Sequence, residues 1–207
     1  MTSIKVAING VAGKMGREVL ASLCRESDME PVGAVDILPG ETLDLPDGSG
    51  SIPMFADLGL ILKQTSPQVL VDFSKAEVSV AAVPVAAKLG VSVVVGTTGL
   101  SEENLQEMDR ISKEHGVGIV VAPNFALGAV LLMHLAKQAA AFFDYIDIIE
   151  SHHEAKIDAP SGTALTMAKA IAEGRQYKRN RPQKETLAGT MGGEHQGIGI
   201  HSIRLPG

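Results

Sequence analysis

The chain has 207 residues, of which 18 are basic and 24 acidic, so its formal net charge is −6. Hydrophobic residues make up 45% and charged residues 20% of the sequence, a balance that excludes global disorder and can form one domain with a smaller second one. The negative charge and the lack of tryptophan argue against nucleic acid as a partner, because its binding needs basic and base-stacking surfaces.

A single cysteine, Cys24, can form no internal disulfide and is typical of a reducing compartment. The first residues lead directly into an apolar strand pattern and lack the long apolar segment of a signal peptide. The apolar stretch 125–143 is interrupted by His134 and Lys137, which predicts a buried helix and no membrane span. We expect a cytoplasmic protein, or a plastid protein if the source is a plant.

In chain order, short apolar runs alternate with segments that have helical periodicity. Strands are predicted over residues 4–8, 31–35, 69–73, 91–95 and 117–121. Helices are predicted over residues 14–25, 77–89 and 101–114. The segment 38–53, rich in Gly, Pro and Asp, is predicted to be a surface loop. Strands that alternate with helices form a parallel sheet covered on both faces, which predicts an α/β domain.

Glycines follow the first predicted strand with the spacing G-x-x-G-x-x-G, at Gly10, Gly13 and Gly16. Such glycines let the backbone turn tightly and approach a pyrophosphate at the N-terminus of the next helix. Asp36, at the end of the second strand, is placed to accept hydrogen bonds from an adenosine ribose. These features predict a Rossmann-type domain, and a glycine turn with an unrelated surface aspartate is the alternative.

Two further loops, 96–99 and 122–125, follow predicted strands at the edge where such sheets bind ligands. Their backbone and hydroxyl groups can hold the nicotinamide half of a dinucleotide. Ordinary Gly and Pro turn chemistry explains both loops equally well.

The pattern changes after residue 127. A helix over 128–142, a strand over 146–151, a polar loop and a helix over 163–173 are predicted there. We therefore predict a dinucleotide-binding domain over 1–127 and a partial α+β domain over 128–207. The basic run from Arg175 to Lys184 is predicted to be a solvated mobile loop in preference to a partner-binding patch.

The segment 150–164 reads E-S-H-H-E-A-K-I-D-A-P-S-G-T-A and places three proton carriers, His152, His153 and Lys156, in a loop before a helix. The free N–H groups of a helix start, with the hydroxyls of Ser161 and Thr163, predict a site for a carboxylate substrate. Simple helix capping by these hydroxyls is the alternative. No metal site is expected, because the second histidine of H-E-x-x-H is missing.

Together these segments resemble the dihydrodipicolinate reductase (4-hydroxy-tetrahydrodipicolinate reductase) family of the diaminopimelate route to lysine, over residues 5–207. The motif E-x-H-H-x-x-K-x-D-x-P-S-G-T-A is the most specific part. The resemblance implies a dinucleotide-binding domain followed by a substrate domain that also builds a homotetramer. It implies cofactor contacts at Gly10, Gly13, Lys14, Met15, Asp36, Gly96, Thr97, Thr98, Ala122, Asn124 and Phe125.

The resemblance also implies roles in the second domain. His152 corresponds to a proton donor and acceptor and Lys156 to a proton donor. The implied substrate-binding residues are His153, Ser161, Gly162 and Thr163. The implied reaction is the NAD(P)H-dependent reduction of 4-hydroxy-tetrahydrodipicolinate, a small dicarboxylate, to tetrahydrodipicolinate.

The sequence departs from the family pattern at two places. Ile37 stands where some members have a basic residue that pairs with a 2′-phosphate, so both NADH and NADPH stay open as cofactors. The chain stops at Gly207 whereas family members continue, so the second domain is expected to be truncated and the homotetramer depends on its sheet being complete. The alternatives are another dinucleotide-fold dehydrogenase acting on a small carboxylate, and an inactive truncated nucleotide-binding module.

Overall fold

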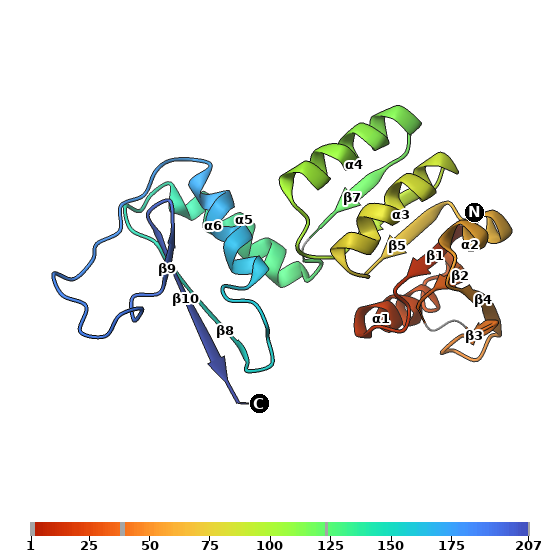
Figure 1. Cartoon of the computed structure of the whole chain (residues 1–207), viewed down its shortest axis with the longest axis horizontal. Coiled ribbons are helices and arrows are strands. Elements are labelled where there is room, and N and C mark those ends of the chain that lie inside the picture. Colours follow the sequence, from red (N-terminus) through yellow and green to blue (C-terminus); the bar gives the residue numbers. More distant parts are fainter. Residues whose placement is uncertain (1–2, 38–39, 123, 207) are drawn as a thin grey trace. The chain divides into compact units, whose positions relative to one another are not determined.

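The computed structural model describes residues 3–37, 40–122 and 124–206 (Figure 1). The chain divides into two compact units, Met1–Ala122 and Pro123–Gly207. Asn124 and Phe125, which were expected in the dinucleotide-binding domain, therefore lie in the second unit. Pro123, in the same expected loop, lies outside the described residues. Within the described ranges no helix combines the length and the apolar character needed to cross a membrane.

The first unit contains a seven-stranded sheet in the order β3-β4-β2-β1-β5-β6-β7. Its strands are β1 (Ile4–Asn9), β2 (Met29–Val35), β3 (Thr42–Asp44), β4 (Ser51–Phe55), β5 (Val69–Asp72), β6 (Ser92–Val95) and β7 (Ile119–Val121). Only the pairing of β3 with β4 is antiparallel among these described strands. The chain leaves β1 toward β2 on one side and later returns to β5 on the other, so the Rossmann-type prediction is confirmed.

Four helices cover this sheet: α1 (Lys14–Leu23), α2 (Leu58–Thr65), α3 (Ala76–Lys88) and α4 (Glu102–His115). Side chains alternate between the faces of a strand, and β1 shows the consequence. Val6 and Ile8 pack in the cluster that holds Leu20 of α1. Ala7 packs in the other cluster, which holds the buried residues of α2, α3 and α4. The sheet is therefore the middle layer, with α1 on one face and the other three helices on the opposite face.

The prediction of a surface loop over 38–53 is wrong, because β3 and β4 form an antiparallel hairpin in this part of the chain. Ile52 and Met54 of β4 are buried, but Pro53 between them and the polar turn before them hid the alternation. The sequence analysis also missed α2, which has only eight residues. Its one local signal is the N-cap Asp57, whose carboxylate accepts the Leu60 N–H at 3.0 Å.

The second unit packs two helices, α5 (Leu127–Ala140) and α6 (Gly162–Ala172), beside a three-stranded sheet (Figure 1). The sheet order is β8-β10-β9, with β8 (Asp147–His153), β9 (Gly193–His195) and β10 (Ile198–Leu205). β8 and β10 are parallel. β8 runs through His153, so the two histidines lie on a strand and not in the loop expected for them.

We predict that Gly16→Ala destabilises the first unit. A Cβ on Gly16 would lie 2.1 Å from the Gly10 carbonyl oxygen and 2.7 Å from the Val11 Cα, both backbone atoms that cannot move aside cheaply. The expected loss is about 2 kcal/mol or more in the free energy of unfolding, measured by urea denaturation. The control Gly118→Ala adds a Cβ only 3.5 Å from Ser92 Oγ, an ordinary contact, so an equal loss in both variants contradicts the prediction.

Candidate active site

The glycine turn joins the ends of β1 and β2. Gly10 has a φ of +80°, a conformation that glycine adopts without strain, and its N–H donates to the Val35 carbonyl at 2.9 Å. α1 begins directly after Gly13, which has no side chain to cap the first N–H groups of the helix. The exposed residues Lys14 and Met15 form this first turn. The arrangement is suited to binding a phosphate group.

Asp36 lies at the glycine turn, as predicted from its position after β2. One carboxylate oxygen accepts the Ala12 N–H and the other accepts the Ile37 N–H, each at 2.8 Å. The carboxylate is therefore fixed against the turn, with part of its surface still exposed. This holds an acceptor next to the place expected for a ribose hydroxyl.

A cavity of about 470 Å³ opens beside these strand ends. Asn9 and Val35 contribute from β1 and β2, and the remaining lining residues come from the start of α2 and one face of α3. The α3 residues are Val78, Ala81, Ala82 and Val85. Small apolar side chains around a cavity of this size can accept a flat aromatic ring.

Phe73 connects the glycine turn with the second glycine loop, a role that the sequence analysis missed. A Cβ on Gly96 would lie 2.2 Å from the Phe73 ring, and one on Gly10 would lie 3.2 Å from the Phe73 carbonyl. The Gly96 N–H also donates to the Asp72 carbonyl at 2.8 Å. These contacts hold the two loops close to each other at the same edge of the sheet.

The buried carboxylate of Asp72 fixes the Phe73 segment. It accepts the amide of Asn9 at 2.9 Å and the backbone N–H of Ser74 at 2.8 Å. Aspartate is rarely fully buried, as Asp72 is here. The available signal in the sequence was therefore this one charged residue within the apolar run 69–73. The expected cofactor residues Thr97, Thr98 and Ala122 follow β6 and β7, with the Ala122 N–H bonded to the Val95 carbonyl at 3.0 Å.

In the second unit, a predicted cofactor residue contacts a predicted substrate residue. The amide of Asn124 donates to the Thr163 hydroxyl at 3.2 Å, and its carbonyl oxygen accepts the Ala126 N–H at 2.8 Å. Ala126 is the N-cap of α5. Asn124 thus links the starts of α5 and α6. Phe125, next along the chain, has a side chain that is about half exposed.

Ser161 is the N-cap of α6, and its hydroxyl accepts the Ala164 N–H at 3.2 Å. The helix-cap alternative therefore describes this hydroxyl, which is buried. Gly162 and Thr163 form the first turn of the helix, which has no acidic side chain of its own. Two carboxylates of the chain lie at the positive end of this helix dipole, because Glu150 accepts the Ser161 N–H and Asp158 accepts a hydrogen bond from the Gly162 backbone.

Glu150 lies under this helix start. One carboxylate oxygen accepts the Arg204 Nη2 at 2.9 Å and the Ser161 N–H at 3.1 Å. The other accepts Arg204 Nη1 at 3.0 Å and contacts His152 Nδ1 directly. Burial alone would raise the pKa of this carboxyl, but the hydrogen bonds outweigh burial and lower the pKa to about 2. Their donors are Arg204, His152, Ser202 and the Ser161 amide.

Lys156 lies in the turn that follows β8. Its N–H donates to the His153 carbonyl at 3.1 Å, and its ammonium is 2.5 Å from an Asp158 carboxylate oxygen. This ion pair is the main cause that lowers the pKa of Asp158. The Lys156 side chain is 23% exposed, so the amine is not sealed into the core. His153 is exposed, and as the neighbour of His152 in a strand it points to the opposite face.

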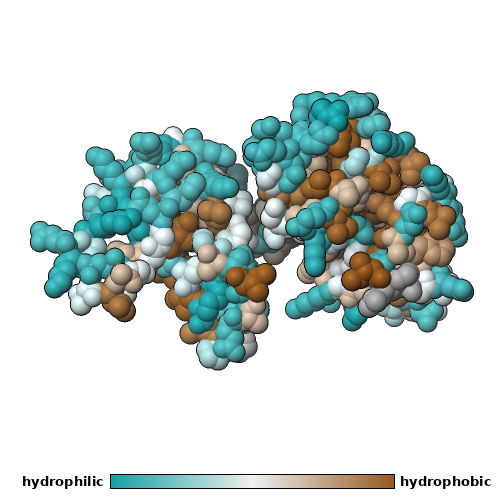
Figure 2. Space-filling view, viewed as in Figure 1, coloured by the Kyte–Doolittle hydropathy of each residue, from teal (hydrophilic) through white to brown (hydrophobic). Residues whose placement is uncertain are grey.

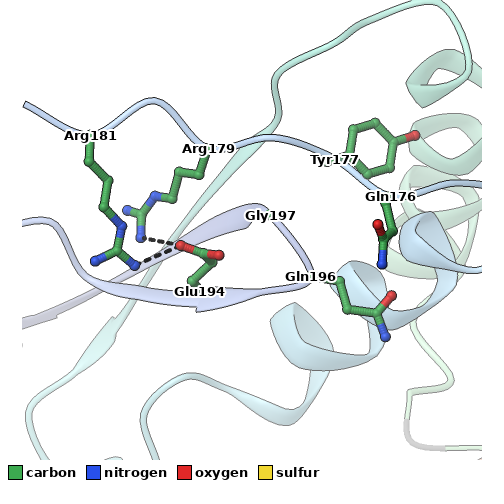
Figure 3. Close-up of a pocket in the computed structure, with 7 residues that line it drawn as sticks. All are labelled: Gln176, Tyr177, Arg179, Arg181, Glu194, Gln196 and Gly197. Atoms are coloured by element: carbon green, nitrogen blue, oxygen red, sulfur yellow. Dashed lines mark hydrogen bonds and ion pairs between the residues drawn. The ribbon is translucent and has the colours of Figure 1, made fainter.

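The basic run is irregular and mostly exposed, as expected of a solvated loop, but Arg179 is an exception and several of its arginines are held by ion pairs. Arg175 donates to Asp144 at 2.8 Å and lies over the Tyr177 ring. The Arg179 side chain is only 4% exposed. Glu194 lies between Arg179 and Arg181, with the Arg181 guanidinium at 2.7 Å (Figure 3). Tyr177, Arg179, Arg181 and Glu194 line a polar cavity of about 560 Å³ that includes none of the predicted site residues. In the described part of the chain, no three His, Cys, Asp or Glu side chains are grouped as metal ligands would be.

The low pKa of Glu150 predicts a pH dependence of stability. A carboxyl whose pKa falls to about 2 on folding adds stability above its unfolded pKa, near 4.3, and loses it as the pH falls toward 2. We expect wild type and Glu150→Gln to differ by on the order of 3 kcal/mol in unfolding free energy at pH 6, and the difference to shrink below pH about 4. Denaturation at several pH values measures it, and a difference independent of pH would contradict the prediction.

Comparison with known proteins gives matches over the whole chain. The family models described as dihydrodipicolinate reductase N-terminus and C-terminus match residues 4–125 and 128–207. The 4-hydroxy-tetrahydrodipicolinate reductase of Dehalococcoides mccartyi is 50% identical over 208 residues, which cover 100% of this chain and 79% of that protein. The Bacillus pumilus protein of the same name is 42% identical, over 99% of this chain and 78% of its own length.

Among solved structures, dihydrodipicolinate reductase from Paenisporosarcina sp. TG-14, with dipicolinate bound, superposes with a TM-score of 0.82. It is 39% identical, and the match covers 100% of this chain and 80% of that one. The sequence motifs, the two units and these matches agree with one another. The chain therefore belongs to the dihydrodipicolinate reductase family.

Proposed function

We propose that this chain is an oxidoreductase that uses NADH or NADPH to reduce 4-hydroxy-tetrahydrodipicolinate to tetrahydrodipicolinate in lysine and diaminopimelate biosynthesis. The observation that carries the proposal lies in the second unit. There His152, Lys156 and the start of α6 occur within one strand–turn–helix segment. The 50% identity with a 4-hydroxy-tetrahydrodipicolinate reductase supports the proposal.

The first unit carries the proposed cofactor site. The turn from Gly10 to Met15 takes the pyrophosphate, and Asp36 accepts from the adenosine ribose. The apolar cavity next to Val35 is the proposed place of the adenine ring. The loops at Gly96–Thr98 and Ala122 are proposed for the nicotinamide half. The bound cofactor supplies the hydride, and the protein positions and polarises the reactants.

The second unit is proposed to bind the dicarboxylate and manage the proton. Gly162 and Thr163, in the first turn of α6, are the proposed contacts of a substrate carboxylate. The substrate first loses its 4-hydroxyl group as water, which gives the conjugated cyclic imine. When hydride then adds to C4, C3 must take up a proton. Lys156 is the proposed donor, because its ammonium brings both a proton and a positive charge that stabilises the developing charge. His152 is proposed to assist this transfer or to relay the proton.

A coupled assay tests the function. Freshly condensed aspartate semialdehyde and pyruvate supply the substrate, and loss of nicotinamide absorbance at 340 nm reports turnover. We expect oxidation of the cofactor that depends on the condensation product and that pyridine-2,6-dicarboxylate inhibits. Cofactor binding with no response to either dicarboxylate would instead favour the truncated nucleotide-binding module. Turnover with a different small carboxylate only would favour another dehydrogenase.

We predict that Lys156→Ala lowers kcat by at least about 100-fold, because an acid and a cation are removed together. The control is Lys169→Ala, an exposed lysine on α6 with no part in the proposed site, which should keep kcat within a factor of two or so. Near-normal turnover by Lys156→Ala would rule out its role as proton donor.

We predict that Asp36→Ala raises the Kd for NADH about tenfold, or roughly 1.4 kcal/mol, the value of one charge-assisted hydrogen bond. The loss for NADPH should be smaller, because the same change removes repulsion between the carboxylate and a 2′-phosphate. Fluorescence titration of both cofactors measures the constants, with Asp44→Ala as the control from exposed β3. An unchanged Kd for NADH would remove Asp36 from the site.

A homotetramer is also part of the proposal. Ile149, Ile203 and Leu205 are exposed on one face of the β8-β10 pair, and Ile149 is 71% exposed. Figure 2 shows apolar side chains at the surface of this unit. A face of this kind is typical of a sheet that packs against another copy.

The relatives compared above are bacterial, which agrees with the expected cytoplasmic location and gives no support to a plastid.

A further inference from the structure

We infer that Glu150 and Arg204 are positioning residues for His152: Glu150 holds the imidazole with its proton on Nδ1, and Arg204 keeps Glu150 oriented. The inference rests on the proposed function and adds two residues to it. In this arrangement Nδ1 keeps its proton throughout, and Nε2 is the atom that takes up and releases the relayed proton. Arg204 lies outside the sequence motif 150–164. Glu150 is the first residue of that motif, but no role in the reaction has been assigned to it above.

The contacts of Glu150 carry the first step. Each carboxylate oxygen accepts at least two hydrogen bonds, and the side chain is only 8% exposed, so the group has one orientation. A carboxylate can only accept, so the nitrogen that faces it must carry the hydrogen. His152 faces it through Nδ1. The tautomer of a histidine is set by the partner of one ring nitrogen, and here that partner leaves Nε2 as the exchanging atom.

The exposure of the two side chains carries the second step. The Glu150 side chain is buried, whereas the His152 side chain on the same strand is 37% exposed. The Nδ1 side of the ring is therefore held by Glu150, while part of the ring is exposed to solvent. A proton carrier needs this combination, because a ring that rotates freely would present either nitrogen to the substrate.

Arg204 carries the third step. It lies on β10 and pairs with His152 in the parallel register. Both terminal nitrogens of its guanidinium donate hydrogen bonds to the Glu150 carboxylate. Nη2 also donates to the Asp158 carbonyl at 2.5 Å, in the turn between Lys156 and the N-cap of α6. One bidentate ion pair thus connects the strand of the proton relay, the lysine-bearing turn and the helix start.

A purely structural role is the rival explanation. Buried ion pairs add little net stability compared with apolar packing, although removal of one partner is costly. Both explanations allow the loss of stability predicted above for Glu150→Gln, but a purely structural role predicts that the loss of Glu150 lowers kcat by the same factor with and without His152. A positioning role predicts an effect on the proton step that exists only while His152 is present.

The first experiment is a double-mutant cycle in kcat. We expect Glu150→Gln to lower kcat on the order of 100-fold with the Kd for NADH unchanged, because the proposed cofactor site lies mainly in the first unit. In a His152→Asn background, Glu150→Gln should add less than about twofold. The matched control is Glu154→Gln, an exposed glutamate in the same segment, with unchanged kcat. Losses that multiply in the double variant overturn the inference.

The second experiment uses Arg204→Met, which keeps Glu150 and its contact with His152. Without the guanidinium, burial raises the pKa of Glu150 while the Ser202 hydroxyl, the Ser161 amide and His152 are the donors that remain. The carboxylate then gains a proton at a higher pH than in wild type. We expect kcat of the variant to fall relative to wild type as the pH is lowered, and a ratio that stays constant down to the pH at which the chain unfolds overturns the role of Arg204.

The third measurement needs no turnover. Nitrogen-15 chemical shifts of the His152 ring distinguish the two neutral tautomers in the unliganded full chain. The Nδ1–H form supports the inference, and the Nε2–H form overturns it, whether or not the chain is active. A chain without reductase activity would contradict the proposed function alone, so the two failures are distinguishable.

Discussion

The second unit depends on one buried negative charge, the carboxylate of Glu150. It is stable there because Arg204, the Ser161 amide and His152 surround it with donors, and the same donors keep its pKa near 2. Each donor comes from a different part of the site: the parallel neighbour strand, the helix start and the strand of the proton relay. A buried charge tolerates no missing donor, so these parts are held in one arrangement.

The first unit has a corresponding constraint in its backbone contacts. Gly16 lets α1 approach the glycine turn, and Phe73 fills the space between this turn and the loop that begins at Gly96. The buried Asp72 fixes the backbone that carries Phe73. The loops that follow β1, β2, β5 and β6 therefore form one rigid edge of the sheet. A dinucleotide needs such an edge, because its phosphates and sugars are bound mainly by backbone groups.

In the proposed function, the two units carry different halves of the chemistry, with hydride delivery assigned to the first and substrate binding and proton transfer to the second. The link between the starts of α5 and α6 through Asn124 shows that the segment after the first unit is already part of the second. The proposed substrate site has no metal ligands in the described residues and uses a lysine, a held histidine and a helix start. This set suits a dicarboxylate, whose negative charges match the donors.

The sequence by itself determined the parallel sheet, the glycine turn with Asp36, and the segment that contains His152, Lys156 and Ser161, because these are local patterns of periodicity, spacing and residue type. It did not reveal the β3–β4 hairpin, the burial of Arg179, or that β8 continues through both histidines. Arg204 reaches Glu150 from 54 residues away, and no local pattern marks that partnership. Only the tertiary structure decided these features, because the free energy of a buried charge or an edge strand depends on neighbours that are distant along the chain.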